Sequence, residues 1–128
     1  MFEGCEELTL VPSGLLPATT LADACYKQMF KGCVKLITAP ELPAETLTAY
    51  SYNSMFEGCS SLNSVTCLAT NISAANCTSN WLKNAGTDAS VTSRTLHIKT
   101  GQSTTDGNWN LATSGDGGDN KWTAVADQ

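Results

Sequence analysis

The sequence is poor in charge, and above all in positive charge. Charged residues make up 15% of the 128 residues, and the seven lysines and arginines stand singly along the chain. A protein that follows a nucleic-acid backbone needs a basic stripe, so this distribution argues against nucleic acid as a partner. No apolar run approaches the roughly 18 residues of a membrane helix, so membrane insertion is not expected either.

Motifs for catalysis and for metal binding are also lacking. His97 is the single histidine, and no two cysteines have the spacing of a zinc site. The sequence has no phosphate-binding glycine loop, no Gly-x-Ser-x-Gly and no paired-carboxylate motif. We therefore predict no enzymatic activity, no metal and no cofactor. The alternative is an enzyme whose chemistry comes from residues without a motif, such as a Cys–His pair.

What the sequence does contain is an internal repeat. Met-Phe-Glu-Gly-Cys at Met1 recurs as Met-Phe-Lys-Gly-Cys at Met29 and as Met-Phe-Glu-Gly-Cys at Met55, at spacings of 28 and 26 residues. A leucine follows each cysteine by three residues, and a degenerate fourth copy begins at Trp81. Repeat units therefore start near residues 1, 29, 55 and 81 and fill residues 1–86. Residues 87–128 are predicted to form an irregular last repeat and a C-terminal cap.

This period predicts a solenoid, because one unit of this length cannot bury its apolar face alone. A repeat of 26 to 28 residues falls in the range of leucine-rich repeats. The predicted fold class is α/β: a leucine-rich-repeat solenoid of about four strand-plus-helix units with an atypical C-terminal cap. The predicted strands are 7–11, 35–39, 61–65 and 95–99, with a last one at 122–125. The apolar spacing predicts helices over 18–30, 44–56 and 73–82, and the Gly- and Asp-rich stretch 114–120 is predicted to be a loop.

The repeat unit resembles a known family. Its Met-Phe-x-Gly-Cys-x-x-Leu segment is followed by proline and by Leu-Pro-Ala-x-Thr-Leu, as in residues 16–21 and 42–47. This pattern is similar to that of the BspA-like leucine-rich-repeat proteins of Bacteroides-type bacteria, which also occurs in their phages. The resemblance covers residues 1 to about 86 and implies a surface-exposed, often lipid-anchored binding scaffold. Residues 1–5 carry neither a signal-peptide pattern nor a lipidation motif, so the chain departs from the family there.

The strand face carries the candidate ligand-binding residues. Side chains that alternate with the predicted inward leucines point outward, because successive residues of a strand face opposite sides. They form a grid of small polar and charged groups, for which ordinary solvated surface is the alternative. The grid consists of Glu7, Thr9, Lys35, Ile37, Ser61, Asn63, Thr95 and His97.

The cysteines are predicted to be structural. Cys5, Cys33 and Cys59 share one column of the repeat, so their side chains would stack about 4.8 Å apart, one strand spacing. Such thiols fit as small buried hydrophobic groups in the reduced form. A second column holds Cys25, Ser51 and Cys77. Cys67 lies outside both columns and is the best candidate for a disulfide partner, which is the alternative.

Together these features predict a non-enzymatic binding or adhesion module that displays its strand face to a protein or glycan. A structural or receptor-binding component of a phage virion, such as a fibre or assembly domain, is the alternative. The expected location is the cell surface or extracellular space in the parent protein, or else the virion. No polar segment precedes the first repeat, so another chain or further repeats are expected to cover that end.

Overall fold

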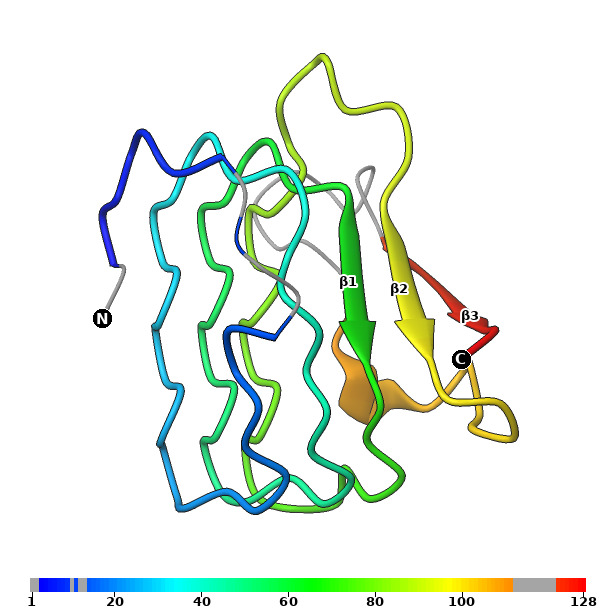
Figure 1. The fold of residues 1–128 in the computed structure, drawn as a ribbon. Coiled ribbons are helices and arrows are strands. Elements are labelled where there is room, and N and C mark those ends of the chain that lie inside the picture. The colour runs from blue at the N-terminus through cyan, green and yellow to red at the C-terminus, as the bar shows by residue number, and fades with distance from the viewer. Residues whose placement is uncertain (1–2, 10, 12–13, 112–121) are drawn as a thin grey trace.

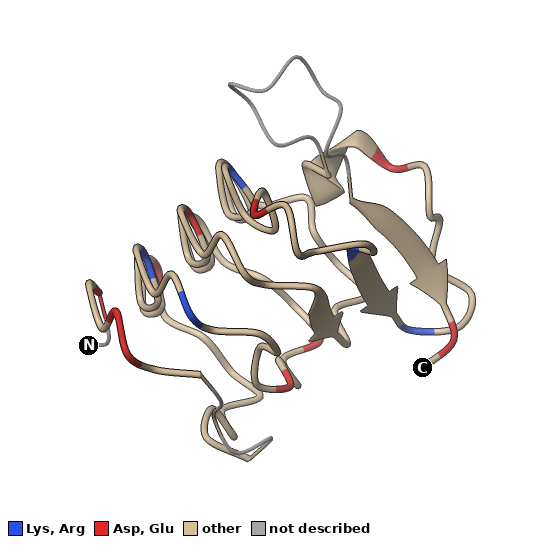
Figure 2. Cartoon of the chain, turned by 90° about the horizontal axis from the view of Figure 1, so that it is seen from above, with Lys and Arg blue, Asp and Glu red and all other residues tan. Residues whose placement is uncertain are grey.

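The chain winds into a stack of coils, seen from the side in Figure 1 and from above in Figure 2. This computed structural model describes residues 3–9, 11, 14–111 and 122–128. Equivalent residues of successive repeats lie one above the other, as shown by the parallel rings of Phe30 and Phe56, whose centroids are 5.7 Å apart. Each coil has one side made of extended chain and one side made of successive turns, and the apolar core lies between the two sides. The predicted loop 114–120 lies outside the described residues.

The extended side becomes a regular sheet only toward the C-terminus. Strands β1 (Ser64–Cys67), β2 (Thr95–Ile98) and β3 (Thr123–Ala126) are parallel and lie in the order β1-β2-β3. The second coil joins β1 and the chain beyond it only through isolated bridges, at Thr38, Leu42 and Thr46. Pro40 stands between the first two bridges and has no N–H to donate, so the ladder is interrupted there.

The prediction of one helix per repeat is wrong, and with it the α/β class. Residues 18–30, 44–56 and 73–82 contain no helix, and the 3-10 helix η1 (Gly107–Trp109) is the only helix among the described residues. The structure instead places successive turns on that side of each coil. We call these segments turn ribbons; they are residues 23–32, 49–58 and 75–84.

Every fourth residue of a turn ribbon has a positive φ angle. The positions in the three ribbons are Ala24, Gln28 and Gly32; Tyr50, Ser54 and Gly58; and Asn76, Asn80 and Asn84. Hydrogen bonding alternates along the same segments. The N–H of Lys27 donates to the carbonyl of Ala24 within the ribbon at 3.2 Å, whereas the N–H of Tyr26 donates to Ser51 of the next coil at 3.1 Å. Local turns and coil stacking thus share the backbone groups that a helix would pair internally.

The error has a physical reason. Buried side chains recur every four residues along the second ribbon and the residue after it, at Ser51, Met55 and Cys59, and this spacing is close to that of a helix face. A helix turns by about 100° per residue, so a strict spacing of four drifts by about 40° at each step. After eight residues, side chains with this spacing would therefore no longer share one face of a helix. In a structure that repeats every four residues, they stay on the same face. Glycines and asparagines at the positive-φ positions are the signal that distinguishes the ribbon from a helix.

Glycine is expected to stabilise the chain at Gln28, where φ is 59°. A side chain in the left-handed region costs about 1–2 kcal/mol, and glycine's greater flexibility offsets about 0.5–1 kcal/mol of the relief. Gln28→Gly should therefore raise the free energy of unfolding by up to about 1 kcal/mol in urea titrations. Asp23→Gly, in the same ribbon but at negative φ, should lower it by a similar amount. Equal effects of the two substitutions would contradict the assigned backbone.

Candidate functional site

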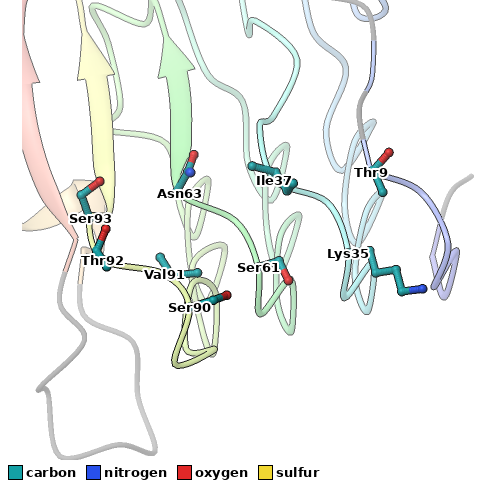
Figure 3. A pocket seen from close by; sticks show the side chains of 9 residues that line it. All are labelled: Thr9, Lys35, Ile37, Ser61, Asn63, Ser90, Val91, Thr92 and Ser93. Atoms are coloured by element: carbon teal, nitrogen blue, oxygen red, sulfur yellow. The ribbon is translucent and has the colours of Figure 1, made fainter.

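Much of the predicted strand-face grid lines a groove of about 400 Å³, shown in Figure 3. Thr9, Lys35, Ile37, Ser61 and Asn63 come from three successive coils. The remaining lining residues belong to the loop between the third turn ribbon and β2, which we call the groove loop (residues 87–94). They are Ser90, Val91, Thr92 and Ser93. The structure therefore brings five of the eight predicted residues together, against a wall that the sequence analysis assigned only to the irregular last repeat.

Thr95 and His97 lie elsewhere. Thr95 pairs with Ser64, and His97 pairs with Thr66 on the outer face of the sheet. Nδ1 of His97 lies 2.9 Å from Oδ2 of Asp127, so the imidazole is hydrogen-bonded to that carboxyl at the C-terminal end of the sheet. The hydrogen bond from the side chain of Gln128, and after it the contact with His97, lower the pKa of the Asp127 carboxyl.

Within the predicted grid, alternation with the repeat leucines makes Thr9, Ile37, Asn63 and His97 equivalent positions of successive repeats. This equivalence is wrong at His97 because the fourth coil is longer. The N–H groups of Asp88 and Thr95 donate to the carbonyls of Ser60 and Asn63. Seven positions on one side (95 − 88) therefore match three on the other (63 − 60), which leaves four extra residues in the fourth coil. These extra residues form the groove loop, which bulges outward. The spacing of the leucines therefore does not predict which residue of the fourth coil lies beside Asn63.

The groove loop is held by its own hydrogen bonds. Oδ1 of Asp88 accepts from the N–H of Ser90 at 2.9 Å and from its hydroxyl at 2.8 Å, and these bonds lower the pKa of the Asp88 carboxyl. Arg94 donates through Nε to the carbonyl of Gly86 and through Nη2 to the carbonyl of Val91 at 3.2 Å. The guanidinium thus ties the base of the loop to its tip, and the wall of the groove is formed before any ligand arrives.

Charge in the groove is largely balanced. Lys35 is its one lining cation among the described residues, and its Nζ lies 2.9 Å from Oε2 of Glu7. Glu7, from the predicted grid, therefore neutralises the groove rather than lining it. Lys31, Glu57 and Lys83 alternate in sign in a second row across the coils, with Glu57 3.8 Å from each lysine, and Figure 2 shows the same interleaving along the stack.

The thiol column is part of the core. All six cysteines are reduced thiols rather than disulfide partners; Cys33 and Cys59 are fully buried, and Cys5 is half-buried. The Cys59 thiol donates to the carbonyl of Phe30 at 3.0 Å, which links two coils. Burial raises the pKa of Cys59 and of Cys67 to about 12, so neither thiol ionises near neutral pH. Among the described residues no group of three His, Cys, Asp or Glu side chains could hold a metal ion.

We expect thiol labelling at pH 8 to divide the cysteines. Cys25 is exposed and should react within minutes with a disulfide reagent, followed by the half-buried Cys5. Cys59 and Cys67 should react only as fast as the protein unfolds, because they are both buried and protonated. Mass spectrometry of the labelled peptides over time checks this order. Rapid modification of Cys67 in the folded protein would show that the core is not packed as described.

No family model, curated protein or solved structure matches the chain. Within the described part of the chain, no helix has the length and apolar character needed to cross a membrane. The resemblance to BspA-like repeats thus stays a prediction, and the case for function depends on the geometry of the groove.

Proposed function

We propose that this chain is a non-enzymatic binding module that holds its ligand in the groove between the strand face and the groove loop. The observation that carries the proposal is the preformed wall. Arg94 and Asp88 fix the loop at the place where side chains from three coils converge. A fixed wall lowers the conformational entropy lost on binding, so even a shallow groove can contribute useful affinity.

The backbone along the floor of the groove is already paired, which disfavours a peptide bound as an added strand. The N–H of Ile37 donates to Thr9, that of Asn63 donates to Ile37, and that of Thr95 donates to Asn63, at 2.9–3.1 Å. Recognition by strand addition needs a free row of backbone groups. A ligand in this groove must therefore be recognised by side chains.

Those side chains favour a neutral glycan. The hydroxyls of Thr9 and Ser61 and the amide of Asn63 make no hydrogen bond to other described residues, so they are available to sugar hydroxyls. Ile37, which is 43% exposed, and Val91 offer apolar surface to the C–H face of a sugar ring. The Glu7–Lys35 pair leaves little net charge to attract an ionic ligand. The module would display this groove to a neutral oligosaccharide.

A blocking substitution tests the groove. Ser61→Trp should fill it and reduce the affinity for any neutral oligosaccharide found on a glycan array at least tenfold by isothermal titration calorimetry. Thr66→Trp is the matched control, since Thr66 lies on the outer face of β1 beyond the groove. Unchanged affinity in Ser61→Trp would place the ligand elsewhere. Binding of peptides and of no glycan would show that the ligand class is wrong.

A further inference from the structure

Backbone hydrogen bonds between coils run in one direction in the turn ribbons and in both directions on the sheet side. On the sheet side, N–H groups donate to both neighbouring coils: Ile37 donates back to Thr9, and Ala39 donates forward to Ser64. In the ribbons every described backbone–backbone hydrogen bond between coils runs forward, as from Tyr26 to Ser51 at 3.1 Å and from Tyr52 to Cys77 at 2.9 Å. Each ribbon therefore has a donor edge toward the following coil and an acceptor edge toward the preceding one.

The acceptor edge of the first complete ribbon, residues 23–32, is largely open. The carbonyl of Lys31 accepts from the N–H of Gly4 at 2.7 Å. The carbonyls of Cys25 and Lys27 are equivalent to those of Ser51 and Asn53, which accept from the preceding ribbon, yet they accept from none of the described residues. Two strong acceptors with fixed spacing thus stand at this edge without a donor in the part of the chain that the structure describes.

Side chains at the same edge are more exposed than the equivalent side chains of the following coils. Cys25 is exposed, whereas Ser51 and Cys77 in its column are 0% and 2% exposed. Tyr26 is half-buried and stacks on the fully buried Tyr52, with 6.2 Å between ring centroids. The outer face of the Tyr26 ring therefore continues the interface that already joins the coils.

We propose that this edge is an interaction surface for a further coil with the same turn ribbon and a free donor edge. Such a coil would donate N–H groups to Cys25 and Lys27, place an aromatic ring over Tyr26, and place a small side chain over Cys25. The proposal does not depend on the groove or on its ligand.

A second copy of this chain does not fit the surface. Two copies meeting at their acceptor edges would oppose carbonyl to carbonyl, which leaves every acceptor unpaired. The donor edge of residues 75–84 carries the chain's own C-terminal segment: Thr78 donates to the carbonyl of Asn108, and the Trp81 ring stacks on Trp109 at 6.5 Å between centroids. The partner must therefore be a coil whose donor edge is uncovered.

The test supplies that donor edge. Met1 is equivalent to Met29, so a copy of residues 21–28 fused before Met1 extends the chain in register. We expect thiol labelling of Cys25 to slow at least tenfold and the midpoint of thermal unfolding to rise. The control extension carries proline in place of the copies of Tyr26 and Gln28, which removes two donors and the aromatic ring.

Each outcome decides the matter. Protection of Cys25 by the first extension and not by the proline control supports the proposal. Equal labelling of Cys25 in both extended proteins overturns it. Protection in the unextended chain that disappears on dilution would mean that a second copy covers the edge, and this too would overturn it.

Discussion

Replacing Trp81 by alanine is expected to lower the free energy of unfolding by about 3–5 kcal/mol. Trp81 is fully buried where the third coil meets the C-terminal segment, and its ring lies 6.1 Å from that of Tyr52 and 6.5 Å from that of Trp109. Removal leaves a large cavity in the middle of the aromatic stack, and the neighbouring rings cannot close it without breaking the hydrogen bonds between coils. Urea denaturation followed by circular dichroism measures the change.

Phenylalanine at the same position separates packing from hydrogen bonding. The Nε1 of Trp81 donates to the carbonyl of Trp109 at 2.7 Å. Trp81→Phe keeps most of the stacked surface and leaves that buried carbonyl without its donor, so a loss of about 1–3 kcal/mol is expected. An alanine variant as stable as the phenylalanine variant would show that the aromatic stack contributes little.

Sequence reasoning found the repeat and its columns and misjudged the backbone that carries them. The Met-Phe columns and the thiol column give phase along the chain, and β2 lies within the predicted strand 95–99. β1 lies three residues beyond the start of the predicted strand 61–65, because strand pairing depends on neighbours in the adjacent coil. The choice between a helix and a four-residue turn depends on φ angles. The asparagines at 76, 80 and 84 indicated those angles more directly than the apolar pattern did.

The sequence predicts which residues form the floor of the groove, but it does not predict the loop that forms the wall. Thr9, Ile37 and Asn63 follow from simple alternation along extended segments of equal length. The groove loop arises from four extra residues in one coil, and nothing in the repeat pattern indicates which way such an insertion folds. Its direction is decided by Arg94, whose bonds to the carbonyls of Gly86 and Val91 are contacts over short sequence distances that no periodicity reveals.

Gly86→Ala is expected to destabilise the chain by more than about 3 kcal/mol and to loosen the groove loop, because backbone strain and a steric clash add together there. Gly86 is buried with φ of +70°, and a Cβ atom would lie 2.7 Å from the carbonyl oxygen of Leu62 and 3.1 Å from Cγ and Nε of Arg94. The Leu62 oxygen is backbone and cannot move aside, so Arg94 must shift away from the Gly86 carbonyl. Hydrogen exchange at the N–H of Val91, which donates to Asp88 at 3.0 Å, should then become faster.

Gly58→Ala is the matched control for strain without a clash. Gly58 has φ of +78°, and its added Cβ would meet only the N and Cα of Gly32, both at an ordinary 3.7 Å. Its expected cost is therefore the strain alone, about 1–2 kcal/mol, with no change in exchange at Val91. The difference between the two alanine variants isolates the contact between Gly86, Leu62 and Arg94. Equal losses of stability together with unchanged exchange at Val91 would mean that Arg94 does not hold the groove loop, and the preformed wall on which the binding proposal depends would be lost with it.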